Sequence, residues 1–312
     1  MDNYYQKLAH LLAKGNYQRK TITEGEDLGQ EGIFADEKLL IATRDNLNFS
    51  TALGESIMAK PHLLVFGGGH ISLALYQLAR LQNMEMTVFD DREEFANQER
   101  FPEAEIVCAP FEQILAQKRD ISGAYYVIVT SGHSYDRQCL AYALRQQHQY
   151  VGMIGSKEKI ALTYEKLKKQ GYSEQELQGV FSPIGLDIGG DTPQEIAISI
   201  MAQIISVYAK DKHRILIDSQ LINQISLCTG KAIVVRVLSK NGSTPATPGA
   251  TMLVSKNRIL GTVGGGALEK KAIEDAQKAT RNFIKEYDLS NGSELGMACG
   301  GRATLLFTMI YQ

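Results

Sequence analysis

The amino-acid sequence predicts an α/β protein with a Rossmann-like doubly wound parallel sheet and a smaller α+β domain. Between residues 62 and 205, short apolar runs of strand length alternate with segments of helical periodicity. This alternation is typical of a parallel sheet that is covered by helices on both faces. After about residue 230, several strand-like runs are followed by a glycine turn and a helix, which indicates a second domain with one sheet.

The composition is that of an ordinary globular protein. A length of 312 residues favours about two domains, and the chain is 44% apolar and 22% charged. The net charge of −2 gives no general attraction to nucleic acid or to an acidic membrane surface, so we expect neither as a partner. The N-terminus does not resemble a signal peptide, and no run approaches the ~18 apolar residues of a membrane-spanning helix. The four cysteines are far apart and lack metal-ligand spacing, so we expect a cytoplasmic protein without a metal site.

Three segments are expected along the chain. Residues 2–14 suggest a short amphipathic helix, and residues 17–45 suggest strands that could complete the sheet of the small domain. Residues 46–60 read as a polar connection, and a charged break near residues 208–213 ends the alternating region. The expected segments are therefore an N-terminal segment at 1–60, a Rossmann-like domain at 61–211 and a small domain at 212–312.

The strongest local signal lies between His62 and Asp91. A strand-like run at Leu63–Phe66 meets three glycines, a helical spacing begins at Ile71, and a second strand ends in an acid about 20 residues further on. Such a turn lets the backbone approach a pyrophosphate at a helix N-terminus, and the acid is placed to bind a ribose. The alternative is a glycine turn in a doubly wound sheet that binds nothing. The candidate ligand contacts are Gly67, Gly68, Gly69, His70 and Asp90.

Other loops follow the predicted strands and are expected at the same edge of the sheet, where ligands gather. His133 and Asp136 are the only His/Asp pair among these loops and could polarise a ligand or carry a proton. The alternative is that Asp136 caps the helix that begins near Tyr135 and that His133 is merely exposed. Further candidate contacts in these loops are Gly155, Ser156 and Asp187.

One helix start is explicit in the sequence. Thr192 is placed as an N-cap, Pro193 as the first helical residue and Glu195 as the partner in a capping box. This arrangement predicts a helix that begins at Pro193, and it gives Glu195 a structural rather than a catalytic role.

The last hundred residues contain three glycine-rich loops. Glycine is favoured where the backbone must turn sharply or approach a ligand closely, and Gly264, Gly265 and Gly266 precede a predicted helix whose N-terminus could attract an anion. Cys299 lies in such a loop, MACGG, where nearby amides could favour its thiolate. The other three cysteines lie in apolar or helical surroundings, for which packing is the simpler interpretation.

Several of these motifs together resemble a known family. GSTPATPGATML, ILGTVGGGALE and ACGG resemble the small domain of the XdhC/CoxI family, the xanthine dehydrogenase accessory factors. VFGGGHIS, VFDDRE, GMIGSKEK and PIGLDIGGDTPQEIAISIMAQII resemble the Rossmann domain of that family. The resemblance covers roughly residues 60–312.

The sequence departs from the family pattern in three respects. The small domain usually precedes the Rossmann domain, whereas here it follows. Ala267 stands where many members have a cysteine, which leaves Cys299 as the matching thiol, and Ala246 stands where an arginine is common. The last change puts strong binding of a cofactor phosphate at that loop in doubt.

The resemblance implies a chaperone rather than a catalyst. Such a protein would bind the molybdenum cofactor in its molybdopterin form, assist its sulfuration and deliver it to a molybdenum hydroxylase such as xanthine dehydrogenase. It also implies a homodimer and leaves open a cysteine desulfurase as a second partner. Cys299 would be the sulfur or cofactor contact. Two alternatives remain open, an NAD(P)-dependent oxidoreductase and a regulatory module that senses another nucleotide.

Overall fold

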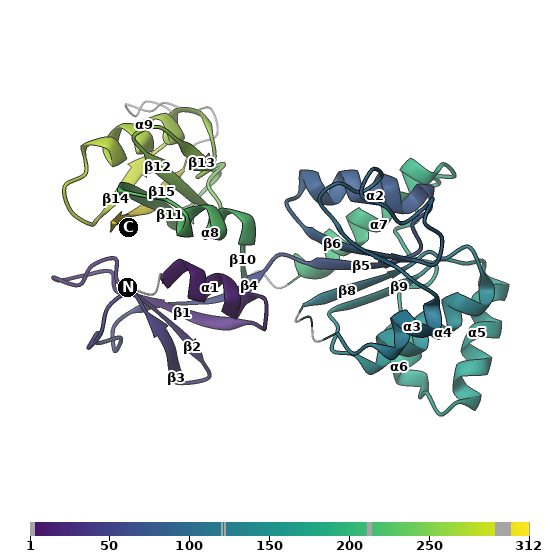
Figure 1. Ribbon diagram of the computed structural model, residues 1–312. Coiled ribbons are helices and arrows are strands. Elements are labelled where there is room, and N and C mark those ends of the chain that lie inside the picture. The colour runs from purple at the N-terminus through teal and green to yellow at the C-terminus, as the bar shows by residue number, and fades with distance from the viewer. Residues whose placement is uncertain (1–3, 120, 122, 211–213, 291–300, 312) are drawn as a thin grey trace. The chain divides into compact units, whose positions relative to one another are not determined.

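The computed structural model describes residues 4–119, 121, 123–210, 214–290 and 301–311. The chain divides into two compact units (Figure 1). One consists of residues 60–212 and is called the Rossmann unit below. The other combines residues 1–59 with residues 213–312 and is called the split unit. In the described part of the chain, no helix is long and apolar enough to cross a membrane.

The Rossmann unit is built on a parallel five-stranded sheet in the order β7-β6-β5-β8-β9. The chain starts at the central strand β5, moves outward through β6 and β7, and then returns to the other side of β5. This reversal creates a topological switch point between β5 and β8, and the sheet confirms the predicted fold class. The strands are β5 (His62–Phe66), β6 (Glu85–Asp90), β7 (Glu105–Cys108), β8 (Ala124–Ile128) and β9 (Tyr150–Met153).

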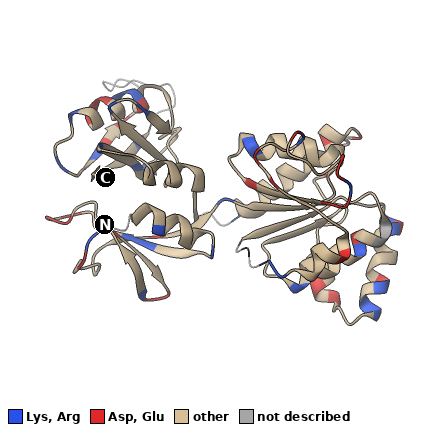
Figure 2. Cartoon of the chain, in the orientation of Figure 1, with Lys and Arg blue, Asp and Glu red and all other residues tan. Residues whose placement is uncertain are grey.

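Helices cover both faces of this sheet because its strands are apolar on both sides. One core lies between the sheet and the helices α2 and α7, and the other lies between the sheet and the helices α3 to α6 (Figure 1). Thr192 caps α7 and Glu195 closes the capping box, as the sequence predicts. The helices are α2 (His70–Leu81), α3 (Phe111–Ala116), α4 (His133–Arg145), α5 (Lys157–Lys169), α6 (Glu174–Gln178) and α7 (Pro193–Tyr208). Acidic and basic residues are interspersed on the outer helices (Figure 2).

The split unit contains two five-stranded sheets. The first has the order β10-β4-β1-β2-β3 and the second the order β13-β12-β11-β15-β14. The first sheet comprises β1 (Tyr17–Thr21), β2 (Glu31–Ala35), β3 (Lys38–Ala42), β4 (Leu53–Ala59) and β10 (Arg214–Ile217). The second comprises β11 (Lys231–Asn241), β12 (Thr251–Ser255), β13 (Ile259–Gly261), β14 (Phe283–Asp288) and β15 (Arg302–Tyr311).

Helices complete the split unit. Apolar residues of α1 (Tyr4–Leu12) and α8 (Ser219–Ser226) form one core with residues of both sheets, and α9 (Gly266–Lys278) packs on the second sheet in another core. The strands at residues 17–45 therefore form a sheet of their own with β4 and β10, and they do not complete the sheet of the small domain as expected. Residues 46–60 also differ from the expectation, because they contain β4 rather than a connection without structure.

The two chain segments that lead to and from the Rossmann unit are neighbours in one sheet. β4 pairs in parallel with β10, with Ser56 opposite Arg214 and Ala59 opposite Ile217. The Rossmann unit is therefore inserted between two adjacent strands of the split unit. Residues from both ends of the sequence must come together to complete the first sheet.

A buried group of charges joins the two sheets of the split unit. Nη1 of Arg236 on β11 lies 2.6 Å from Oε1 of Glu31 on β2, and its Nη2 donates to Oγ1 of Thr21 at 2.7 Å. Nε of Arg19 donates to Oε2 of Glu55 at 2.9 Å. Arg19 is 3% exposed and Arg236 4% exposed. The two arginines and two glutamates compensate each other's charge, which is what burial of such groups requires.

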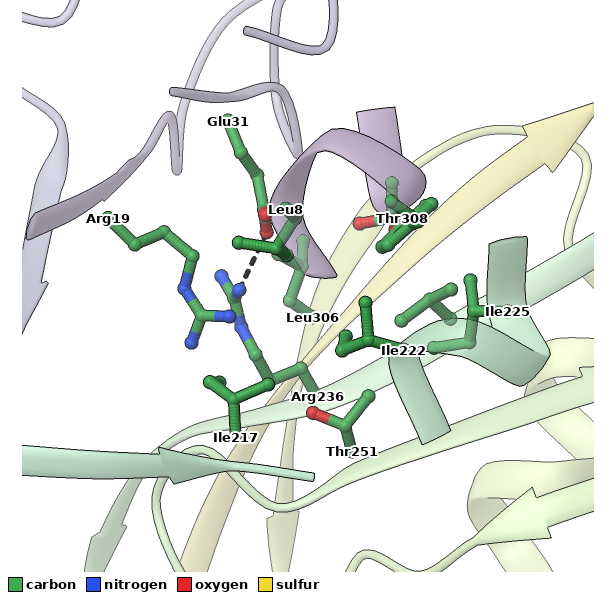
Figure 3. A pocket seen from close by; sticks show the side chains of 12 residues that line it. Leu8, Arg19, Glu31, Ile217, Ile222, Ile225, Arg236, Thr251, Leu306 and Thr308 are labelled. Atoms are coloured by element: carbon green, nitrogen blue, oxygen red, sulfur yellow. Dashed lines mark ion pairs between the residues drawn. The ribbon is translucent and has the colours of Figure 1, made fainter. Parts of the chain in front are cut away.

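A small cavity adjoins this charge group (Figure 3). Its volume is about 20 Å³, room for a water molecule. Nη2 of Arg19 and Nε of Arg236 have no hydrogen-bond partner among the described residues. An ordered water would satisfy such donors, so the cavity fits a role in structure.

We expect Arg236→Met to destabilise the split unit. The change leaves Glu31 buried without its cation, which typically costs roughly 3–5 kcal/mol. Urea unfolding followed by circular dichroism measures this loss. Arg302→Met is the control, because Arg302 makes only exposed contacts with Glu286 and Asp288. An equal loss of stability in both variants would contradict the importance of the buried pair.

Candidate functional site

The candidate site lies at the carboxyl end of the Rossmann sheet, where the turn after β5 faces the turn after β8. The amide of Gly67 donates to the carbonyl of Phe89 at 2.7 Å, which ties this turn to β6. Gly67 has φ of +106°, and a Cβ atom there would lie 2.5 Å from the carbonyl oxygen of Val129. A side chain cannot be accommodated, so Gly67 brings the two turns together at the switch point.

The next two glycines differ in what surrounds them. A Cβ atom at Gly68 would lie 2.5 Å from the carbonyl oxygen of Phe95, so packing within the chain requires a glycine. A Cβ atom at Gly69 would meet nothing within 4 Å, and its φ of −67° is open to any residue. Gly69 is the N-cap of α2, and no side chain caps this helix. The open space beside an uncapped helix N-terminus is a suitable place for an anionic group.

Asp90 ends β6 next to this turn and is 1% exposed. Its Oδ2 accepts from the Gly68 amide at 2.7 Å and from Nη2 of Arg92 at 2.9 Å. Its Oδ1 accepts from the Arg92 amide at 3.1 Å and from Nε of Arg92 at 2.8 Å. A carboxylate has about four lone-pair sites, and all of them are used. The predicted contact between Asp90 and a ribose hydroxyl would therefore require Arg92 to move.

The electrostatics agree with this geometry. Burial alone would raise the pKa of Asp90, but the hydrogen bonds from Arg92 and from the Gly68 amide outweigh burial and hold the pKa below its usual value. The same hydrogen bonds raise the pKa of Arg92. The pair is thus fully charged at neutral pH.

Two arginines near the turn were not predicted as site residues. The guanidinium carbon of Arg92 lies 4.0 Å from the ring centroid of Phe95, and that of Arg100 lies 5.4 Å from the same centroid. Nη2 of Arg100 also donates to the Gly68 carbonyl at 3.0 Å. The one signal in the sequence was the position of Arg92, two residues after the acid of the fingerprint. An arginine there accommodates a phosphate on the ribose in some dinucleotide sites.

Asp136 lies after β8 and is fully buried, with 0% exposure. Its Oδ1 accepts from Oγ1 of Thr130 at 2.6 Å, and Nζ of Lys159 lies 2.5 Å from its Oδ2. Asp136 does not cap α4, because the N-cap is Gly132 without a side-chain hydrogen bond. His133 is the first residue of α4, and its side chain lies outside the described part. The ion pair with Lys159 commits Asp136 to holding the loops after β8 and β9 together, and a role in proton transfer stays a prediction.

The other predicted contacts of the Rossmann unit have ordinary surroundings. The Ser156 hydroxyl caps α5 by accepting from the Lys159 amide at 3.3 Å. Gly155 lies against the side chain of Lys159, and Asp187 and His70 are exposed. None of these positions is excluded from contact with a ligand, and none is required for one.

The glycine triplet of the split unit is occupied by a carboxylate from its own helix. Oε2 of Glu269 accepts from the Val263 amide at 3.2 Å and from the Gly265 amide at 3.3 Å. The Gly264 amide donates to Oγ1 of Thr262 at 3.1 Å. Gly264 and Gly265 are therefore not free donors, and the predicted anion contact at residues 264–266 would require Glu269 to move.

Ala246 packs against the same triplet. It is fully buried, and a Cβ atom at Gly264 would lie 2.9 Å from the Ala246 amide nitrogen. The chain thus has a packing residue at this position, where an arginine was the expected family residue. Cys299 lies outside the described residues.

The described cysteines do not favour a thiolate. Burial and nearby acids such as Glu93 raise the pKa of the exposed Cys108, and burial and Asp136 raise the pKa of Cys139. Within the described ranges, no three His, Cys, Asp or Glu side chains are arranged to hold a metal ion.

Comparison with protein families identifies both parts of the chain. Residues 63–204 match a model described as the XdhC Rossmann domain, and residues 229–288 match a model described as the XdhC and CoxI family. The chain belongs to the XdhC/CoxI family. This confirms the resemblance found in the sequence, including the order with the Rossmann domain first.

Curated relatives match about half of this chain. The Escherichia coli (strain K12) protein YqeB is 31% identical over 149 residues, which are 47% of this chain and 27% of YqeB. A Bacillus subtilis (strain 168) protein, named as one of the probable subunits of xanthine dehydrogenase, is 28% identical over 152 residues, 48% of this chain and 44% of that protein. The match spans less than half of the length of either relative.

A solved structure shares the fold. A crystal structure described as a xanthine dehydrogenase from Bacillus halodurans aligns with a TM-score of 0.53 and 23% identity, and the alignment covers 65% of each chain. At this identity the likeness concerns the fold.

We expect Lys159→Met to destabilise the Rossmann unit, because Asp136 would remain buried without its cation. Loss of one partner of a buried pair costs about 3 kcal/mol or more, and urea unfolding measures it. The double variant Asp136→Asn, Lys159→Met should recover part of the loss. Lys168→Met is the control, since Lys168 pairs with Glu174 at the surface. A single variant as stable as the wild type would show that the pair is not needed.

Proposed function

We propose that this protein is an accessory factor in the maturation of a xanthine dehydrogenase-type molybdenum hydroxylase. In this role it binds the molybdenum cofactor, assists its sulfuration and delivers it to the hydroxylase. We include in the proposal that the turn at Gly67–Gly69 binds the phosphate of a nucleotide, or of the nucleotide half of a dinucleotide-form cofactor. The observation that carries the binding site is the open space at Gly69, beside the uncapped N-terminus of α2.

Family membership supports the accessory role. One relative is named as part of a probable xanthine dehydrogenase, and both family models match in the order that the sequence indicates. A protein of this kind acts on another enzyme, so the hydroxylase is the proposed partner. Bound to this protein, the cofactor would carry the molybdenum chemistry that the hydroxylase later uses.

The described residues fit an anionic group in the Rossmann unit better than in the split unit. The amides of Gly264 and Gly265 already have partners, whereas Gly69 faces open space. An anion at the N-terminus of a helix is typically stabilised by about 0.3–1 kcal/mol, and by more where it is partly buried. We therefore assign the phosphate contact to Gly69 and the start of α2.

The sulfur step requires an accessible thiol. The raised pKa values of Cys108 and Cys139 disfavour the thiolate at neutral pH. Cys299, between Ala298 and two glycines, remains the thiol that matches the family motif. We assign it the contact with sulfur or with the cofactor, and a cysteine desulfurase would be the sulfur donor.

Gly69→Val tests the phosphate contact. The valine side chain would fill the open space beside α2 without a clash inside the protein, so the fold should be kept and nucleotide binding lost. Calorimetric titration with ADP and CDP measures the binding. Gly54→Val is the matched control, because Gly54 in β4 also has nothing within 4 Å of its Cβ position. Undiminished binding in Gly69→Val would contradict the assignment.

Cys299→Ser tests the thiol. Serine keeps the size of the side chain but is neither a sulfur acceptor nor a soft ligand, so activation of a molybdenum hydroxylase in a reconstitution should fail. Cys108→Ser is the control, since Cys108 is exposed but has a raised pKa. If Cys299→Ser activates the hydroxylase as well as the wild type does, the thiol has no part in transfer.

A further inference from the structure

The surroundings of Asp90 determine which ribose the Rossmann unit can accept. In dinucleotide sites, an acid at this position accepts hydrogen bonds from the free ribose hydroxyls, whereas an arginine nearby accommodates a phosphate on the ribose. Here the acid has no lone pair left, because the Gly68 amide and Arg92 occupy all of its acceptor sites. The arrangement selects against a free diol.

Arg92 is fixed in place while part of it stays accessible. Its Nε and one N–H of Nη2 are held by Asp90, and its guanidinium lies over the ring of Phe95. A guanidinium has five N–H donors, so Nη1 and the second N–H of Nη2 remain without a partner among the described residues. The side chain is 33% exposed. A preorganised fork of this kind suits a phosphate.

The charge around the turn sets the size of the effect. Arg100 adds a second positive charge close to the Gly68 carbonyl. Asp91, Glu93 and Glu94 follow Asp90, but all three are exposed, so solvent and salt screen their repulsion. Attraction by the fork then exceeds the repulsion by a moderate margin, which decreases as salt increases.

We propose that Arg92 makes this site selective for a nucleotide with a phosphate ester on its ribose, of the NADP type, over one with a free 2′,3′-diol. This inference rests on the proposed nucleotide site at Gly67–Gly69 and specifies its substrate class. Asp90 is then a positioning residue that holds the Arg92 fork, and Arg92 is the residue that contacts the ligand.

Calorimetric titration of the full chain with NADP⁺, NAD⁺ and ADP tests the proposal. In the wild type, NADP⁺ should bind about tenfold tighter than NAD⁺, which corresponds to about 1.4 kcal/mol, and the difference should shrink at high salt. In Arg92→Gln, the amide can still donate to Asp90 while the charge is removed. NADP⁺ affinity should then fall to the level of NAD⁺, while the affinities for NAD⁺ and ADP stay nearly the same.

Two further variants make the result specific. Arg92→Lys keeps the charge without the fork and should restore part of the preference for NADP⁺. Arg80→Gln removes an exposed arginine of α2 that pairs with Glu103, and it should leave all three affinities unchanged.

The outcomes separate the two proposals. If ADP binds but NADP⁺ and NAD⁺ bind the wild type equally, or if Arg92→Gln weakens all three ligands alike, the nucleotide site stands and the selectivity of Arg92 is overturned. If none of the three binds, the nucleotide site itself is overturned, and the selectivity with it.

Discussion

The parallel pairing of β4 with β10 is the constraint on which the organisation of this chain depends. Parallel neighbours cannot be joined by a tight turn and need a crossover of a dozen residues or more. Here the whole Rossmann unit, residues 60–212, serves as that crossover. Neighbouring strands are about 4.8 Å apart, so the chain leaves the split unit and returns to it at almost the same point. The domain order that looks permuted in the sequence follows from this insertion, because residues 1–59 fold together with the small domain.

Glycine turns in this protein are closed by carboxylates of its own chain. Asp90 accepts from the Gly68 amide, Glu269 from the Gly265 amide, and Glu195 from the Thr192 amide. Each of these backbone donors would otherwise attract an anionic ligand. A glycine-rich motif alone is therefore weak evidence of a phosphate site, because an internal acid can already occupy its amides. Gly69 differs, since nothing in the chain fills the space that its missing side chain leaves.

The parts of the fold that could be predicted from the sequence depend on local patterns. The alternation of strands and helices in the Rossmann unit and the cap of α7 are written in adjacent residues, and the structure has them. β4 was missed because Glu55 makes its sequence look polar. That glutamate is buried by an ion pair with Arg19, which is distant in the sequence. Strand composition also does not specify a partner strand, so the separate sheet of residues 17–59 could not be predicted.

The candidate site shows the same division between local and distant information. The turn, the acid and the helix of the fingerprint were predicted, because their spacing is local. The saturation of Asp90 by Arg92 and the occupation of Gly265 by Glu269 depend on side-chain directions that spacing does not reveal. Both contacts reduce the set of free donors and acceptors that the sequence suggested, and they move recognition from the acid to the arginine beside it.

The buried charges of the split unit address a different problem, which is how two sheets from opposite ends of the chain find one arrangement. Apolar residues could fill the same space at equal or greater stability, because taking charges out of water is costly. Apolar contacts are not directional, however, whereas Arg236 on β11 must meet both Glu31 and Thr21 of the first sheet. A displaced sheet would leave these groups buried without partners, at a cost of several kcal/mol. The charge group therefore selects one arrangement of the two sheets by making the alternatives unfavourable. Because β4 and β10 belong to the first of these sheets, the same selection fixes the strands between which the Rossmann unit is inserted.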